Sequence, residues 1–549
     1  MKLKIKNKFI LVFLICAISF LSIILRINSI ENTPPLDVDE YGIAYEAFSI
    51  STAGLDSWGN KYPIFFRSFG DYKLPFDVYF SALLFNIFEP SHFWLRFPAV
   101  IFGVLYVPII FLLIRTITKS NLIGLIGSLL VALHPHNFYF SQIISGSISA
   151  SFFIFASLTF FIFSINSKKP LLFLIISIFS LILSLYSYPL SWLISPFLTT
   201  TYLISLLFLK RFKHIIVLAL VIPAFIPIIN QFFLGGSSVR LSNTSAFDFN
   251  RGAFMEIAEM REAGKNDLPS RVFHNKGTTS LFVFTNNYLK HFNIEYLSFE
   301  RYKATIQKAP FPPLYMILLP FYFWGIILCL KKFKNPVFIP IIALLLVSPL
   351  PSAITDGAVN SKRYLASMGL DLVFVSLGIQ QIWHKKNLIL IVMGFAVFIF
   401  EVVNFFNYYN IEYKNDAAKN FALKPKAISE ISGKYWPKNN LIYTTSELGE
   451  PQIFPLVGSW FSTNDYLESR EIEERDNWFY IKPFSGLYYF EDMIKLNEYL
   501  NSNPDFEAIA ILSLNEKEEL TSNICTENIS TDEINTYEKL TIFKLKKCL

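Results

Sequence analysis

The stretch FILVFLICAISFLSIILRINSIENTPPLDVDEYGIAYEAF, residues 9–48, joins a long apolar run to a group of carboxylates. The apolar run, 9–27, has about the 20 residues that a helix needs to cross a hydrocarbon core. No small-x-small cleavage pattern follows it, so we interpret it as a membrane anchor and not as a signal peptide. Three acids, Asp37, Asp39 and Glu40, come soon after it. Their position predicts polar chemistry at a membrane surface.

The composition of the whole chain is typical of a polytopic membrane protein. Of 549 residues, 53% are hydrophobic and 58 are Phe, a content that excludes an ordinary soluble domain. The net charge of +6 does not indicate a nucleic-acid partner, because the basic residues form short clusters between apolar runs. Four cysteines are too few for a disulfide framework, and the pairing of Cys525 with Cys548 is left open.

Apolar segments predict about eleven membrane spans. They are 9–27, 93–114, 121–134, 138–166, 170–187, 189–209, 214–234, 312–330, 336–354, 364–383 and 387–407. Basic residues mark every second connection between them: MKLKIKNK (1–8), Arg115 with Lys119, SKK (167–169), KRFK (210–213), KKFK (331–334) and HKK (384–386). Short basic connections are cytoplasmic, so we expect a cytoplasmic N-terminus in a multi-pass protein of the cytoplasmic membrane.

This pattern predicts two domains. Residues 1–407 form a helical transmembrane domain with external loops 28–92 and 235–311, and residues 408–549 form a small extracytoplasmic α/β domain. In the tail, strands are predicted at NLIYTT, WFYIK, EAIAILSL and KLTIFKL, and helices at KPKAISEISGKY and FEDMIKLNEYL. The span centres carry almost no charge, which disfavours the alternative of a transporter or flippase.

The acids after the first span have the pattern of a helix start. Two prolines disfavour helix before them, and Asp37 with Glu40 has the spacing of a capping box. That interpretation leaves Asp39 without a role. The helix dipole stabilises a carboxylate in the first turn as an anion, so Asp39 is suited to accept a proton.

The order of motifs resembles a known family. After the acids come GLDSWGNKYP (54–63), SFGDYKLPFDVY (68–79), FWLRFPAVIFG (93–103), SLYSYPLSWLISP (184–196), RVFHNKGTTSLFVFTNNYLKHF (271–292) and KRYLASMGLDLVF (362–374). Over most of residues 30–380 the chain is similar to bacterial membrane glycosyltransferases of the family 39 type. These are relatives of protein O-mannosyltransferases and of the lipid A aminoarabinose transferase.

The resemblance implies a GT-C fold, a polyprenyl-phosphate sugar as donor, and transfer at the outer face to an envelope protein, lipid or glycan. It also implies that the catalytic acids are Asp39 and Glu40. A carboxylate takes the proton of the acceptor hydroxyl, and cations stabilise the charge that develops on the leaving phosphate. The alternatives are a transporter or flippase and a catalytically degenerate envelope binding protein.

Further residues are expected to contact the substrates. The candidates for the donor phosphate are basic: Arg96, Arg363, Lys362 and Lys276. The candidates for other substrate contacts are Asp37, Asp71, Lys73, His134, Gln142 and Tyr288. Simpler roles compete with these, including snorkelling of Arg96 to headgroups, a turn at Asp71 and loop closure at Lys276.

A divalent metal is a further option. His134 and His136 flank a proline, and with Asp39 and Glu40 they supply ligands that such metals accept. The competing interpretation is a polar turn at the membrane interface, so we assign no cofactor with certainty.

One stretch departs from the family pattern. Where relatives commonly have Arg followed by an acid, this chain reads FSQIISGSISAS (140–151), with Gln142 and no acid. The departure predicts either a different substrate or a weakened enzyme.

Overall fold

The structure is a computed structural model of the 549-residue chain. It describes residues 8–30, 36–68, 71–234, 251–265, 267–301, 308–355, 359–383, 388–413, 423–444, 451–475, 478–503, 505–521, 524–532 and 540–547. The chain packs into two compact units, and each is described by itself. The helical unit comprises Met1–Glu31 and Ala99–Ile411, and the mixed unit comprises Asn32–Pro98 and Glu412–Leu549.

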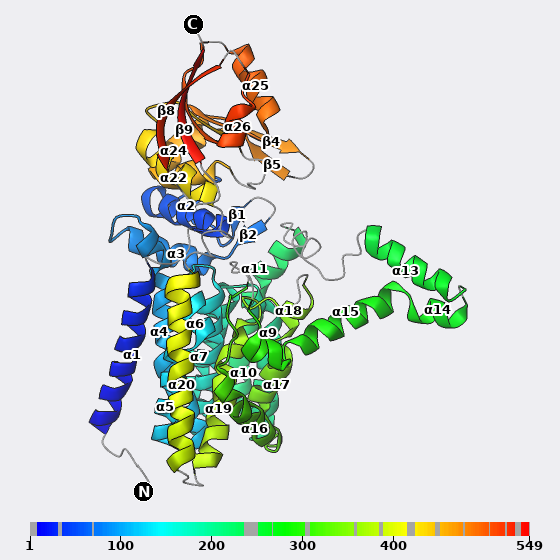
Figure 1. Cartoon of the computed structure of the whole chain (residues 1–549). Helices are drawn as coiled ribbons and strands as arrows, with labels where there is room; N and C mark the ends of the chain where they lie inside the picture. Colours follow the sequence, from blue (N-terminus) through cyan, green and yellow to red (C-terminus); the bar gives the residue numbers. More distant parts are fainter. Residues whose placement is uncertain are drawn as a thin grey trace. The chain divides into compact units, whose positions relative to one another are not determined.

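The helical unit consists of apolar helices that run roughly alongside one another (Figure 1). They are α1 (Lys8–Ile30), α4 (His92–Thr118, which begins in the mixed unit), α5 (Asn121–Ala132), α6 (Pro135–Phe140), α7 (Ser147–Asn166), α8 (Pro170–Leu185), α9 (Leu190–Phe208), α10 (Phe212–Leu218), α11 (Val221–Leu234), α16 (Leu319–Leu330), α17 (Ile339–Val347), α18 (Leu350–Ala353), α19 (Met368–Trp383) and α20 (Leu388–Tyr408). The connection between α11 and α16 adds α13 (Arg251–Ala263), α14 (Leu268–Phe273) and α15 (Lys276–Lys290).

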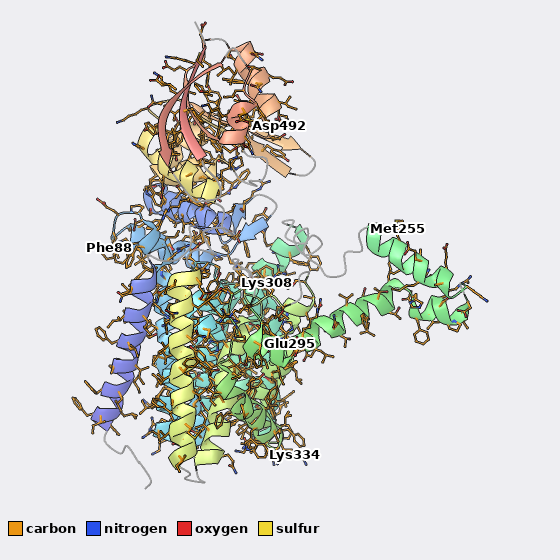
Figure 2. The ribbon with its side chains drawn as sticks, viewed as in Figure 1. Phe88, Met255, Glu295, Lys308, Lys334 and Asp492 are labelled. Atoms are coloured by element: carbon orange, nitrogen blue, oxygen red, sulfur yellow. The ribbon has the colours of Figure 1, made fainter. Side chains whose placement is uncertain are left out.

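These helices confirm a polytopic helical membrane protein. Each predicted span contains an apolar helix or a consecutive pair of helices. Among the described residues, six helices are long and apolar enough to cross a membrane, and shorter apolar helices accompany them. The exposed basic turn after α16 ends at Lys334, which Figure 2 shows at one end of the bundle. The sidedness of the chain stays a prediction from its basic clusters.

The span predicted over 138–166 begins later in the structure than the sequence indicates. Helix α6 ends at Phe140, and α7 begins only at Ser147. Gly146 between them has φ +75°, a conformation that residues with a side chain rarely adopt. A Cβ atom there would also overlap the carbonyl oxygen of Ser187. Hydropathy does not detect this break, because the apolar pattern continues across it.

Close packing between α16 and α19 requires two glycines. A Cβ atom at Gly325 would overlap the carbonyl of Phe374, and one at Gly378 would overlap the carbonyl of Phe321. Small residues allow helix backbones in a membrane to approach in this way, so that dispersion contacts hold the helices together. The two positions therefore fix the distance between α16 and α19.

We expect Gly325→Ala to destabilise the protein by about 1–3 kcal/mol, since the added methyl group has no space. The measurement is the thermal unfolding midpoint in detergent. Gly394→Ala in α20 is the matched control, because a Cβ atom at Gly394 meets nothing within 4 Å. Equal midpoints for the two variants would contradict the packing argument.

The mixed unit combines the first loop with the tail. Its elements are α2 (Val38–Ala53), β1 (Phe66–Ser68), β2 (Asp71–Lys73), α3 (Pro75–Phe85), α22 (Leu423–Tyr435), β3 (Leu441–Thr444), α23 (Ile453–Ser459), α24 (Thr463–Ser469), β4 (Ile472–Arg475), β5 (Trp478–Ile481), β6 (Leu487–Phe490), α25 (Met493–Ser502), β7 (Ala508–Ser513), α26 (Leu514–Glu518), β8 (Ile524–Asp532) and β9 (Leu540–Lys547). The strands β3, β5, β7 and β9 and the helices α22 and α25 confirm the elements predicted in the tail.

The tail contains a five-stranded mixed sheet in the order β6-β3-β7-β9-β8. Strand β3 pairs in parallel with β6 and β7, while β9 is antiparallel to β7 and β8. Ile442, Leu496, Ala510 and Phe543 belong to one buried apolar cluster that joins α25 to the sheet. Cys525 in β8 is disulfide-bonded, whereas Cys548 lies outside the described residues.

Candidate active site

The candidate site is built on the first turn of α2. Asp37 is the N-cap: its side chain accepts a hydrogen bond from the Asp39 N–H at 3.1 Å. The Glu40 carboxylate accepts one from the Asp37 N–H at 3.2 Å, which confirms the predicted capping box. Asp39 itself is exposed. The cap thus fixes the start of the helix and leaves the Asp39 carboxylate at the surface of the mixed unit.

A buried ion pair between Glu40 and Arg96 fixes this turn. Glu40 is fully buried and Arg96 is 4% exposed. The Arg96 Nε donates to one carboxylate oxygen of Glu40 at 2.9 Å, and its Nη2 donates to the other at 2.7 Å. Two parallel charge-assisted bonds fix both the distance and the plane of the pair. Arg96, predicted as a donor-phosphate ligand, therefore directs two of its nitrogens at Glu40.

Lys73 reaches the same face of α2 from the hairpin β1–β2. Phe66 pairs with Lys73 in that antiparallel hairpin. Its ammonium lies against Gly42, where any Cβ atom would overlap it. Gly42 is three residues after Asp39 and hence on the same helix face. The structure thus gathers an acid and a cation on one face of α2.

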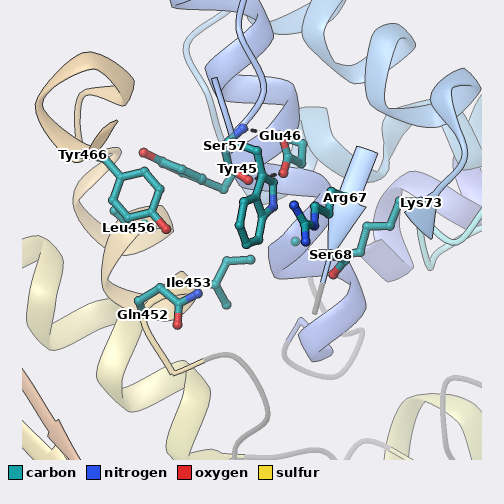
Figure 3. A pocket seen from close by; sticks show the side chains of 12 residues that line it. Tyr45, Glu46, Ser57, Arg67, Ser68, Lys73, Gln452, Ile453, Leu456 and Tyr466 are labelled. Carbon is teal, nitrogen blue, oxygen red and sulfur yellow. Dashed lines mark hydrogen bonds between the residues drawn. The ribbon is translucent and has the colours of Figure 1, made fainter. Parts of the chain in front are cut away.

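A pocket opens on the next turn of the same face (Figure 3). Its lining comes from α2, the loop and hairpin after α2, α23 and α24: Gly42, Tyr45, Glu46, Ser57, Trp58, Arg67, Ser68, Lys73, Gln452, Ile453, Leu456 and Tyr466. Its enclosed volume of about 20 Å³ is enough for one water-sized group. All of these residues belong to the mixed unit.

Glu46 is the buried acid of this pocket. It is 5% exposed, and it accepts hydrogen bonds from the Ser57 N–H at 2.9 Å and from the Ser57 hydroxyl. Burial raises the pKa of Glu46 to about 7, although the bonds from Ser57 and the Lys73 ammonium oppose the shift. Glu46 therefore changes charge near neutral pH, unlike an exposed glutamate.

This pKa predicts a pH-dependent stability. The folded state binds the Glu46 proton more tightly than an unfolded chain with the ordinary pKa of 4.5, so stability is lost as pH rises from 4.5 through about 7. We expect the free energies of unfolding of wild type and Glu46→Gln to diverge over this range, by on the order of 3 kcal/mol. Glu498→Gln, at an exposed position of α25, is the control. A difference independent of pH would contradict the assignment.

The other predicted substrate residues belong mostly to the helical unit, and many are engaged within it. Gln142 is buried; its Oε1 accepts from the Tyr409 hydroxyl at 2.8 Å. The Tyr288 hydroxyl donates to the carbonyl of Leu346 at 2.9 Å. Lys276 is the first residue of α15. Asp71 begins β2 in the mixed unit.

Lys362 and Arg363 precede α19 in the helical unit. Lys362 is 5% exposed, and its Nζ lies 5.4 Å from the ring centroid of Tyr188. Arg363 is half-buried, and its backbone N–H bonds to Asn360. The pair thus combines an ammonium held against an aromatic ring with a partly accessible guanidinium.

The contacts of the two histidines do not fit a metal site. His134 caps α6 by accepting from the Asn137 N–H, and the His136 Nε2 lies 3.0 Å from the carbonyl of Phe311. Within the described ranges, no group of three His, Cys, Asp or Glu side chains comes together in a way that would hold a metal ion. We derive no metal-dependent step.

Sequence reasoning missed three features. Glu46 is two helical turns after Asp39, a spacing that indicates a shared helix face but not burial. The sequence around Gln452 and Tyr466 does not indicate a functional site, because only the tertiary structure brings these residues to α2. Arg26 in α1 is also fully buried, where it donates to Ser141 Oγ at 2.9 Å.

By sequence, no family model and no curated protein matches the chain. Among solved structures, ArnT from Cupriavidus metallidurans bound to undecaprenyl phosphate aligns over 97% of each chain, with a TM-score of 0.55 and 9% identity. The chain has a GT-C-like fold. This confirms the predicted fold class, and at this identity the likeness concerns the fold alone.

The Archaeoglobus fulgidus oligosaccharyltransferase, tethered with an acceptor peptide containing the NVT sequon, aligns with a TM-score of 0.49 and 14% identity. The alignment covers 82% of this chain and 63% of that one. The chain therefore spans less than two thirds of the length of that enzyme.

Proposed function

We propose that the chain is an integral-membrane glycosyltransferase. It moves a sugar from a polyprenyl-phosphate donor to a hydroxyl group of an envelope acceptor at the outer face of the cytoplasmic membrane. The observation that carries the proposal is the exposed Asp39 carboxylate on a fixed helix start, one helical turn before Gly42, which the Lys73 ammonium contacts. The GT-C-like fold supports it, since the ArnT structure of that fold contains undecaprenyl phosphate.

The reaction requires few catalytic groups. The acceptor oxygen attacks the anomeric carbon, the bond from that carbon to the phosphate oxygen breaks, and the polyprenyl phosphate leaves as an anion. Asp39 takes the proton of the acceptor hydroxyl. A cation close to the departing phosphate stabilises the charge that develops there, and Lys73 is suited to that role in the mixed unit.

Glu40 is proposed to be a positioning residue for Asp39. Its carboxylate is buried and bonded to Arg96 and to the cap of α2, so it holds the turn that carries Asp39. Arg96 takes part in the same way. We propose three further cations for the donor phosphate, Arg363, Lys362 and Lys276. We also propose further substrate contacts at His134, Gln142 and Tyr288.

The test is sugar transfer by the purified full-length chain. Radiolabelled polyprenyl-phosphate sugars are supplied one at a time together with a cell-envelope extract, and each extract fraction is counted. Label in a protein, lipid or glycan fraction identifies both donor and acceptor. Absence of label with every donor, from protein that unfolds cooperatively, would contradict the proposal and favour a degenerate relative.

A further inference from the structure

The pocket beside Glu46 lies apart from the Asp39 carboxylate along α2, and the reaction proposed above leaves most of its residues without a role. Two segments that are distant in the sequence form its walls. One is α2 with the loop that follows it, and the other is α23 with α24 of the tail. Figure 3 shows side chains of both segments directed at the same space.

The walls of the pocket are held in place by their own contacts. Ser57 engages both oxygens of the buried Glu46 carboxylate. The Trp58 ring contacts two guanidinium groups, with its centroid 4.5 Å from the Arg67 Cζ and 5.2 Å from the Arg470 Cζ. Arg470 also donates to the Ser57 carbonyl. The shape of this wall is therefore established before any ligand arrives.

Gln452 supplies an unused polar group. It is 3% exposed and lies at the N-cap of α23, yet its side chain does not cap that helix. Gln452 lines the pocket, and its side chain makes no hydrogen bond to any residue that the structure describes. The carboxamide is therefore available both to donate hydrogen bonds to a ligand in the pocket and to accept them.

The chemistry of the lining selects against ions. Glu46 disfavours a phosphate or carboxylate ligand, and the cations Arg67 and Lys73 disfavour an amine. A carboxylate, an amide and aromatic rings around one small space suit hydroxyl groups on a partly apolar ring. The enclosed space admits one such group, for example a hydroxymethyl arm, with the remainder of the ring at the open mouth.

We propose that this pocket binds a neutral saccharide of the acceptor, with Glu46 and Gln452 as hydrogen-bond partners. The assignment rests on the proposed function, because it names the acceptor class for the same active site. Since α23 and α24 form half of the pocket, it also gives the tail a role in acceptor choice.

The test measures saccharide binding without any donor, by saturation-transfer NMR titration of the full chain in detergent. The probes are short neutral oligosaccharides of glucose, galactose, mannose and N-acetylglucosamine, with inorganic phosphate as the anionic probe. At least one neutral probe should saturate, and Gln452→Ala should raise its Kd about tenfold through the loss of its hydrogen bonds. Gln381→Ala, the same change at an exposed position of α19, should leave Kd unchanged.

Gln452→Ala is the primary variant because the side chain has no structural bond to lose; Glu46→Gln is the second. The proposal is overturned if no neutral probe saturates, if the Gln452→Ala and Gln381→Ala variants bind equally, or if only phosphate binds. Displacement of the saccharide by a polyprenyl-phosphate sugar would overturn the acceptor assignment in favour of the donor sugar. Because no transfer is required, a failed transfer assay and a failed binding assay are distinguishable.

Discussion

Asp39→Asn should lower the rate of sugar transfer by about 10²–10⁴-fold, the range for loss of a general base. The amide has nearly the same size as the carboxylate and keeps an oxygen at the N-terminus of α2, but it cannot take the proton of the acceptor hydroxyl. The measurement is the initial rate of labelled product at saturating donor. We expect kcat to fall and the apparent KM for the donor to change little, because proton transfer occurs only in the reaction step.

The matched control for this substitution is Asp465→Asn. Asp465 is also exposed and also in the first turn of its helix, α24. Its replacement removes the same charge from an equivalent position in the same unit, so the transfer rate should stay at the wild-type value. Transfer by the Asp39→Asn protein at the wild-type rate would exclude Asp39 as the base.

Arg96→Met should destabilise the protein by about 3–5 kcal/mol, the cost of breaking a buried ion pair from one side. The methionine fills most of the space, but the Glu40 carboxylate loses its bidentate partner in a buried environment. The free energy of unfolding in denaturant measures the effect. Adding Glu40→Gln to Arg96→Met should recover most of the loss, because the buried charge is then gone.

The control is an ion pair of similar length at the surface. Lys482 and Glu471 lie 3.0 Å apart, with side chains 49% and 74% exposed. Solvent screens such a pair, so Lys482→Met should change stability by roughly 0–1 kcal/mol. If Arg96→Met were equally mild, the Glu40–Arg96 pair would not be what fixes the start of α2.

Local signals in the sequence were sufficient for most of the apolar helices and for the start of α2. The apolar runs predicted the helical unit, and the spacing of Asp37 and Glu40 predicted the capping box, because both are short-range patterns. Short-range patterns could not predict the partner of Glu40, because Arg96 is 56 residues away in the sequence. The family resemblance had implied a catalytic role for Glu40 and a donor-phosphate contact for Arg96.

The pocket also depends on residues that are distant in the sequence. A glutamate in a helix is expected at the surface, so Glu46 gave no reason to predict burial or a raised pKa. Its environment depends on Ser57 in the following loop and on residues of the tail. Gly42 is similar, since the contact of the Lys73 ammonium at this position comes from the hairpin that follows α2. Such contacts follow from tertiary structure and not from the sequence near each residue.

The composition of the mixed unit has a consequence for biosynthesis. Tyr41 of α2 packs edge-on against Phe454 at 5.1 Å between ring centroids, and the Tyr45 hydroxyl bonds to the carbonyl of Phe461. Roughly 300 residues separate these two segments of the unit. At about 5–20 residues per second, a ribosome makes α2 some tens of seconds before its partner segment. For that interval the nascent chain exposes an aromatic helix face, which makes it a substrate for chaperones during synthesis.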